Sequence, residues 1–168
     1  KLSDNLNVIE NYAFDNCKSL TSLTFPASVT NILCDFKSCS SLTEIIVEEG
    51  NTNYVSDEYG VLYTASFAAL KSYPVASVRE SYTVNEATET IAKNAFSYNE
   101  NLKTVILPEG VEKINSYALS ELTAEDVFVF SVVLCDNEID RDGERFTVDS
   151  LKSLEQLFVG KTAIMNHS

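Results

Sequence analysis

The sequence has little positive charge and no long apolar run. Lysine and arginine together number 12, against 25 aspartates and glutamates, which gives a net charge of −13. Nucleic-acid binding depends on Lys and Arg that neutralise phosphates, so this balance argues against a nucleic-acid partner. No apolar stretch approaches the ~18 residues of a transmembrane helix, so we expect no membrane insertion. An acidic composition rich in Ser, Thr and Asn suits a secreted protein that must stay in solution.

Residues that usually carry chemistry are also scarce. His167 is the only histidine, and its neighbour Ser168 alone does not make a catalytic triad. The spacing of the four cysteines contains no CxxC pair of the kind that binds zinc. We therefore predict no catalytic residue, no cofactor site and no metal site, and we expect the protein not to be an enzyme.

Two segments of the chain repeat each other. Ile9–Ile32 and Ile91–Ile114 each run 23 steps from one Ile to the other, with apolar residues at the same offsets. The corresponding pairs are Phe14/Phe96, Leu20/Leu102, Leu23/Val105, Phe25/Leu107 and Pro26/Pro108. A period in the twenties is typical of a solenoid, in which each unit buries its apolar face by stacking on a neighbour.

A second, irregular copy begins at Ile32 and repeats the apolar pattern at a spacing of 22 residues. Within a unit, the segment 20–25 alternates as a short strand that Pro26 ends, and the segment 12–17 is predicted to form a helical turn on the opposite wall. We expect the strands of successive units to stack into one sheet. The residues then expected to be buried are Phe14, Phe36 and Phe96; Leu20, Leu42 and Leu102; and Leu23, Ile45 and Val105.

Two of the cysteines occupy one repeat position in successive units. Cys17 and Cys39 are 22 residues apart, and stacked coils lie roughly 4.8 Å from each other. A disulfide between them is therefore geometrically feasible. The alternative, which we favour, is a pair of buried free thiols that fill small core positions.

The repeat is interrupted between residues 48 and 90. Asn53–Tyr63 reads as a hairpin that turns near Asp57–Gly60, and residues 69–74 read as a further strand that ends at Pro74. The segment 81–84 begins the next regular unit. We expect this insertion to be folded and to belong to the sheet.

These features together resemble the BspA-like leucine-rich repeats. The resemblance covers residues 5–120 and rests on Ala-Phe-x-x-Cys-x-x-Leu-x-x-Leu-x-x-Pro, first seen at Ala13–Pro26, and on the insertion with its Gly60-Val-Leu-Tyr63 and Tyr73-Pro74 segments. Asn99 departs from the pattern, because it stands where Cys17 stands in the first unit. The family implies a curved solenoid in surface or secreted proteins that act as adhesins or bind host molecules, and it brings no catalytic residues.

The C-terminal residues 123–168 read differently from the repeats. A β-branched and aromatic run at 126–135 predicts a buried strand, the segment 150–158 predicts a short helix, and 161–165 predicts a last strand. Residues 112–168 resemble the N-terminal part of tailed-phage prohead proteases, in which a histidine placed like His167 works with a serine far downstream. No such serine follows within these 168 residues. We expect the segment to cap the last repeat, either as a natural cap or as a fused fragment.

An acidic loop in this segment is the best metal candidate. Glu138, Asp140, Asp142 and Asp149 surround Gly143 with spacing close to that of a calcium loop. Glu138 is too long for the first ligand position, and Asp149 does not replace the bidentate Glu of such loops. We therefore interpret the loop as a solvated acidic turn.

Six tyrosines are candidates for a binding face, because tyrosine is favoured in protein contacts. Since most of them stand at insertion or repeat positions, we expect half or more to pack inside the fold. They are Tyr54, Tyr59, Tyr63, Tyr73, Tyr82 and Tyr98.

The sequence thus predicts an α/β-type repeat solenoid, a curved leucine-rich-repeat sheet with short helical turns, over residues 1–122, with a hairpin insertion at about 48–90. A small α+β segment at 123–168 completes the chain. The expected function is recognition of a protein or glycan ligand on a host or neighbouring cell. The alternatives are a fragment related to phage prohead proteases and a structural spacer in a larger surface protein.

Overall fold

The computed structural model describes residues 2–119 and builds them from short β-strands. No helix occurs among these residues. The strands, in chain order, are β1 (Val8–Ile9), β2 (Ser22–Phe25), β3 (Asn31–Ile32), β4 (Glu44–Val47), β5 (Tyr54–Ser56), β6 (Leu62–Thr64), β7 (Ala69–Ser72), β8 (Ser81–Thr83), β9 (Thr90–Ile91), β10 (Thr104–Ile106) and β11 (Lys113–Ile114).

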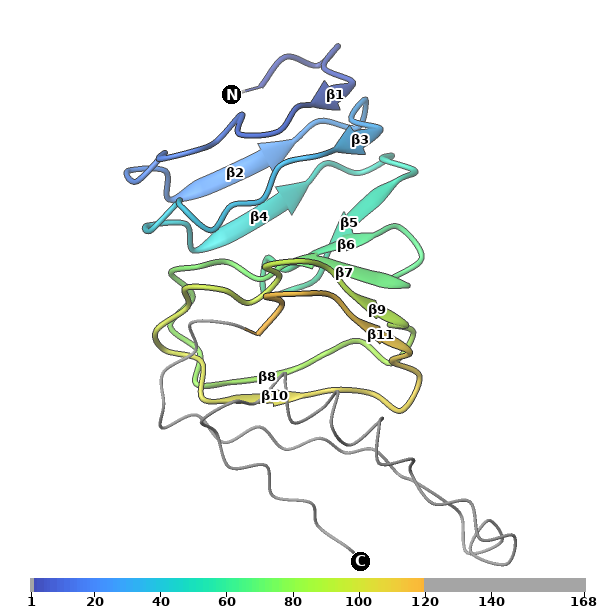
Figure 1. The fold of residues 1–168 in the computed structure, drawn as a ribbon. Helices are drawn as coiled ribbons and strands as arrows, with labels where there is room; N and C mark the ends of the chain where they lie inside the picture. Colours follow the sequence, from blue (N-terminus) through green and yellow to red (C-terminus); the bar gives the residue numbers. More distant parts are fainter. Residues whose placement is uncertain (1, 120–168) are drawn as a thin grey trace, which may run out of the picture.

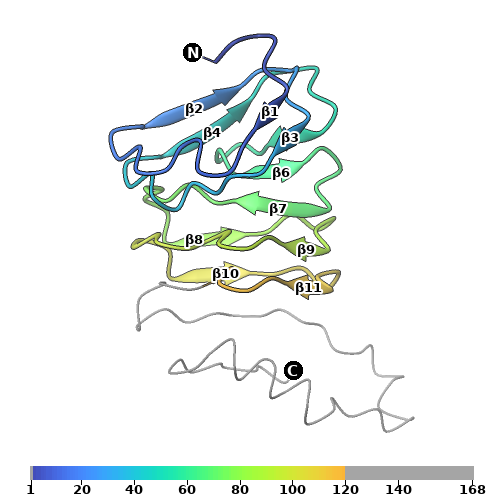
Figure 2. The ribbon, with the colours of Figure 1, turned by 45° about the horizontal axis from the view of Figure 1, so that its top comes forward.

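The chain winds into stacked coils that contribute strands to two walls. In one wall β2 pairs with β4 in parallel, and β8 pairs with β10. In the other wall β1 pairs with β3, and β9 pairs with β11. Figure 1 shows β1 to β4 at one end of the stack, and Figure 2 shows β8 and β9 on one level beside β10 and β11 on the next. The repeat predicted from sequence is confirmed by this register, which places Leu23 beside Ile45 and Ile91 beside Ile114.

The expectation of one continuous sheet is wrong, because the strands of residues 2–119 form four sheets. Part of the difference arises because each coil contributes strands to two separate walls. The hairpin accounts for the rest, since it separates β4 from β8: Ile45 N–H donates to the carbonyl of Gly60 at 3.0 Å, and Ala76 N–H donates to that of Leu42 at 2.8 Å. These two contacts continue the backbone hydrogen bonding at the point where the repeat is interrupted.

The predicted hairpin is present and leads directly into a coil. β5 and β6 pair antiparallel around the turn, and β6 pairs antiparallel with β7. β7 then pairs in parallel with β9, with Leu70 beside Ile91, which makes a five-stranded sheet. The segment from Leu70 to Ile91 is therefore a shortened repeat coil, which the sequence reading assigned partly to the insertion.

The interior forms two apolar clusters on either side of the hairpin. β6 contributes to both clusters, because successive side chains of a strand point to opposite faces. Leu62 belongs to the cluster of the first coils, and Tyr63 belongs to the cluster of the later coils. Seven of the nine residues predicted to be buried are buried: Leu23, Phe36, Leu42, Ile45, Phe96, Leu102 and Val105. Phe14 and Leu20 are only partly buried, because within the described residues the first coil pairs with a coil on one side alone.

The predicted helical turn at 12–17 is replaced by successive tight turns. Tyr12 and Asn16 have φ of 64° and 56°, in the left-handed region, which a right-handed helix does not allow. The same repeat positions are left-handed in the later coils, at Asn94, Tyr98 and Tyr117. The left-handed backbone thus recurs in the first coil and in the coils after the hairpin, whereas Cys34 and Ser38, at the same positions of the second coil, are not left-handed.

Side-chain amides tie successive coils together. Asn99 is buried at the position of Cys17 and Cys39, and its Nδ2 donates to the carbonyls of Pro74, Val75 and Ser77 at 2.9–3.1 Å. Its Oδ1 accepts from the backbone N–H groups of Asn101 and Leu102. Asn51 makes the same kind of contact, to Pro26 and Val29, one coil away from its own. At the repeat position of Cys17 and Cys39, Asn99 thus replaces a small side chain by an amide that forms hydrogen bonds between two coils. We call this arrangement a clamp.

The cysteines in the described part of the chain are free thiols. Cys39 is buried, and its Sγ lies 3.3 Å from the carbonyl oxygen of Phe14, to which it donates. Burial raises the pKa of the Cys39 thiol to about 11. Cys17 and Cys39 are both free, as we favoured, but only Cys39 is buried, since Cys17 is partly exposed. Cys135 lies outside the described residues.

Gly60 lies directly against Glu44 and Ile45 of β4, and we expect Gly60→Ala to be strongly destabilising. Its φ is +74°, and an added Cβ would lie 2.7 Å from Cβ and 2.9 Å from Cα of Glu44. The left-handed conformation alone costs a non-glycine residue about 1 kcal/mol, and the clash with the strand adds to that cost. Chemical denaturation of the variant should show a lower free energy of unfolding.

Two other glycines provide matched controls for this substitution. Gly50→Ala tests the positive φ without the clash, since its φ is +89° and the nearest atom to the new Cβ lies 3.9 Å away. Gly110→Ala introduces neither a strained φ nor a clash, and should leave the stability close to that of the wild type. Equal losses in Gly60→Ala and Gly50→Ala would show that the hairpin does not pack tightly on β4.

Residues 123–168 lie outside the described residues, so the strands, the helix and the acidic loop that we predict there are not described either. Its role as a cap of the last repeat stays a prediction.

Candidate recognition surface

The six candidate tyrosines divide into a buried group and an exposed pair. The four buried residues are Tyr54, Tyr63, Tyr73 and Tyr82. Tyr59 and Tyr98 are exposed. The expectation that half or more would pack inside is confirmed, and the buried tyrosines support the surface from beneath.

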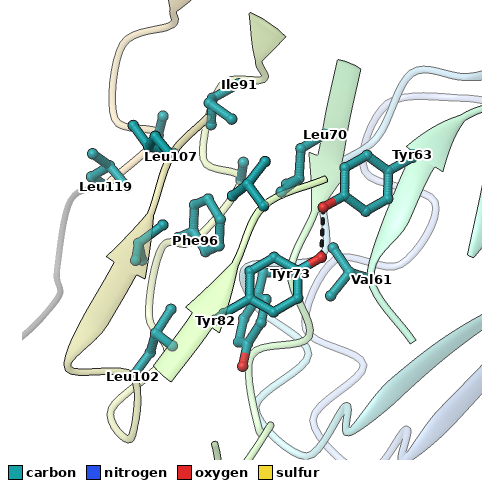
Figure 3. Packing of buried hydrophobic residues seen from close by; sticks show 14 residues of the cluster. Val61, Tyr63, Leu70, Tyr73, Tyr82, Ile91, Phe96, Leu102, Leu107 and Leu119 are labelled. Atoms are coloured by element: carbon teal, nitrogen blue, oxygen red, sulfur yellow. Dashed lines mark hydrogen bonds between the residues drawn. The ribbon is translucent and has the colours of Figure 1, made fainter. Parts of the chain in front are cut away.

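A hydrogen-bonded chain of buried hydroxyls links the hairpin to β8. The hydroxyls of Tyr63 and Tyr82 lie 2.5 Å apart, and a dashed line marks their hydrogen bond in Figure 3. Tyr82 donates in turn to Asp57 Oδ2 at 2.6 Å. Burial raises the pKa of the Tyr63 hydroxyl to about 12 and raises the pKa of Tyr82 further. Both hydroxyls therefore stay protonated at neutral pH and hold the turn at a fixed position.

Three exposed tyrosines stand at left-handed turn positions of the repeat. Tyr12, which is 82% exposed, and Tyr117 follow Ile9 and Ile114 by three residues, and Tyr98 stands at the second turn position. The left-handed region disfavours bulky side chains, and Asn occupies the equivalent positions at Asn16 and Asn94. The sequence reading missed Tyr12 and Tyr117, although their common offset from the repeat isoleucine was available to find them.

A different exposed group lies where the hairpin interrupts the strand wall. The Arg79 guanidinium carbon lies 3.8 Å from the centroid of the Tyr59 ring, and Tyr59 is 37% exposed. Val78, beside Arg79 in the chain, is 80% exposed. We call Tyr59, Val78 and Arg79 the hairpin surface. Sequence reasoning did not identify it, because the stacking of Arg79 on Tyr59 brings together residues 20 positions apart.

The described residues offer little for metal or nucleophilic chemistry. Residues 2–119 contain no group of three His, Cys, Asp or Glu side chains that could hold a metal ion. None of these residues belongs to a helix long and apolar enough to cross a membrane. His167 and the acidic loop formed by Glu138, Asp140, Asp142 and Asp149 lie outside the described part.

Comparison with solved structures gives three similar bacterial proteins. A leucine-rich repeat protein from Eubacterium ventriosum ATCC 27560 is 28% identical with a TM-score of 0.66, covering 74% of this chain and 35% of that one. The pneumococcal vaccine antigen PcpA is 30% identical with a TM-score of 0.67, covering 76% of this chain and 32% of that one. A leucine-rich cell surface protein from Faecalibacterium prausnitzii A2-165 is 28% identical with a TM-score of 0.59, covering 67% of this chain and 30% of that one.

The chain thus spans about a third of the length of each of these proteins. Comparison with curated proteins gave no match. The sequence model of the BspA type leucine-rich repeat region matches six copies, over residues 1–60 and 76–134. The gap between the two matched ranges contains β6 and β7, and the second range continues past residue 122, where we expected the repeats to end. The family model matches well over half of the residues, and strands 22 or 23 residues apart pair in parallel between successive coils. The chain therefore belongs to the family of BspA type leucine-rich repeat proteins.

Proposed function

We propose that this chain is an extracellular recognition module that mediates adhesion or binds a host protein, and that it performs no catalysis. The observation that carries the proposal is the BspA type repeat stack, since similar structures belong to a bacterial cell surface protein and to a pneumococcal vaccine antigen. The same likeness supports a position at the bacterial surface.

The physical character of the stack supports this role. Its apolar side chains are largely placed inside two cores, and the coils are fixed to one another by backbone and amide hydrogen bonds. A rigid scaffold loses little conformational entropy when it binds, which favours affinity. Tyr12, Tyr59, Tyr98 and Tyr117 project from this scaffold as large exposed side chains of the type that often dominates protein contacts.

Two of the three thiols in the described residues support the non-catalytic part of the proposal. A nucleophilic cysteine needs a lowered pKa, whereas burial raises the pKa of both Cys34 and Cys39 to about 11. Turnover of a peptide library that disappears in His167→Ala would instead favour the relationship to prohead proteases.

Binding to defined ligands tests the proposal. The chain is immobilised and exposed to a panel of extracellular-matrix and serum proteins and, separately, to a glycan array. We expect saturable binding to at least one protein of the panel, and no such binding by chain that has been unfolded by heat. A folded chain that binds neither proteins nor glycans would contradict the proposal and favour a structural spacer.

A further inference from the structure

The hairpin surface lies where this chain departs from the regular repeat. The turn at Asp57–Gly60 occupies the strand wall between β4 and β8, held by the hydrogen bonds from Ile45 to Gly60 and from Tyr82 to Asp57. In the regular coils, each strand pairs with the equivalent strand of the next coil. At the interruption, by contrast, side chains of the turn and of the loop before β8 stand at the surface.

Tyr59 is rigidly supported from below. Asp57 Oδ1 accepts from the backbone N–H groups of Tyr59 and Val61 at 2.9 and 2.8 Å, which fixes the turn. The ring of Tyr59 packs edge-on against buried Tyr82, with centroids 6.1 Å apart. A side chain held in this way needs little further ordering when a partner binds.

The guanidinium of Arg79 stacks on the Tyr59 ring, and its N–H donors are available to a partner. Stacking on Tyr59 holds the planar guanidinium in place, and its N–H donors lie in the plane of that group. Within residues 2–119 this guanidinium forms no ion pair and no hydrogen bond to another side chain. Arg79 is also the single arginine of that range.

The neighbouring carboxylates, in contrast, already have partners. Asp57 accepts hydrogen bonds from Tyr82 and from the turn backbone, and Glu80 forms an ion pair with Lys103 at 2.9 Å. A hydrogen bond to Glu58 raises the pKa of the Tyr59 hydroxyl. These groups leave Arg79 as the charged side chain of the hairpin surface that still lacks a counter-ion.

We propose that Arg79, stacked on Tyr59, binds an Asp or Glu side chain of a protein partner, and that exposed Val78 contacts an aliphatic residue beside it. The inference rests on the proposed function, because it assumes that the chain recognises a protein. A guanidinium edge matches a carboxylate with two parallel hydrogen bonds. Stacking of a sugar on this tyrosine is disfavoured, since Arg79 covers one face of the ring. A polyanion is disfavoured by the chain's net charge of −13.

A library of random linear peptides displayed on phage tests this inference on the whole folded chain. We expect the enriched peptides to share an Asp or Glu next to an aliphatic residue. Binding of one synthetic peptide should weaken by at least about tenfold in Arg79→Gln, as expected for loss of a charge-assisted hydrogen-bonded pair. Arg79→Lys should restore part of the affinity, because lysine keeps the charge and loses the planar fork.

Two controls separate recognition from structure. Lys37→Gln removes a surface cation whose ion pair with Asp35 is 3.8 Å long, and it should leave peptide binding unchanged. Changing the peptide's acidic residue to its amide should weaken binding to the wild type and add little to the loss in Arg79→Gln. Thermal melting of each variant checks that the fold is intact.

The outcomes distinguish this inference from the proposed function. Enriched peptides without an acidic residue, equal binding by Arg79→Gln, or no enrichment at all would overturn the role of Arg79. If a panel protein still binds saturably in those cases, and binds Arg79→Gln equally well, the proposed function stands while this inference fails. If neither the panel nor the library binds, both fail.

Discussion

Replacing Phe96 by alanine is expected to lower the free energy of unfolding by about 3–5 kcal/mol. The ring is fully buried and packs against Tyr73 and Tyr82, with ring centroids 5.3 and 6.2 Å away. Buried residues of one core cluster surround it within the described part of the chain, so the structure has little freedom to collapse into the space that the ring leaves. Differential scanning calorimetry should show a fall in Tm on the order of 10 °C.

Phe14→Ala is the matched control, because Phe14 holds the same repeat position in the first coil. Phe14 is only partly buried, so its truncation removes less buried area and should cost clearly less than that of Phe96. An unchanged Tm in Phe96→Ala, or equal losses in the two variants, would show that the repeat alignment does not describe the packing.

Asn99→Ala is expected to destabilise the chain by at least about 3 kcal/mol, since even one unsatisfied buried polar group costs about 1–3 kcal/mol. The substitution leaves the carbonyls of Pro74, Val75 and Ser77 without the donor that they share. It also removes the acceptor of two backbone N–H groups in the turn before β10. Denaturant unfolding followed by circular dichroism measures the loss.

Asn101→Ala provides the control at a nearby position. The Asn101 amide donates once, to Ser77 at 3.1 Å, and its side chain is exposed, so we expect a loss below about 1 kcal/mol. Comparable losses in Asn99→Ala and Asn101→Ala would contradict the clamp that Asn99 forms between coils.

The features that local chemistry dictates were predictable from the sequence. Equal offsets of apolar residues gave the stacking register, because a solenoid must place like residues over like. The turn at Asp57–Gly60 was predictable because its residue types favour turns and apolar, β-prone segments flank it. Pro26 follows directly after the end of β2, as the lack of an N–H donor requires, whereas β7 already ends at Ser72, two residues before Pro74.

The features that depend on contacts between coils were not predictable. The coil from Leu70 to Ile91 is shorter than its neighbours, and Tyr82 stands in the register position of Val105, so the apolar pattern does not match the other units. The left-handed backbone of Tyr12 and Tyr117 was hidden, because tyrosine gives no signal of positive φ. The clamp role of Asn99 was also hidden, since its hydrogen-bond partners are the carbonyls of residues 74–77, more than 20 positions earlier in the chain.

The candidate site shows the same division between local and long-range information. The sequence identified tyrosine as the relevant residue type, and burial then removed four of the six candidates. Arg79 carried no sequence signal, because its significance comes from its position over the Tyr59 ring and from the lack of a counter-ion among the described residues.

Binding of the fluorescently labelled chain to epithelial cells, measured by flow cytometry, tests the central claim that this repeat stack is a recognition module. Saturable binding that excess unlabelled chain displaces, and that disappears when the chain is unfolded by heat, is the predicted result. Signal that rises without saturation, or that is equal for folded and unfolded chain, would contradict the claim.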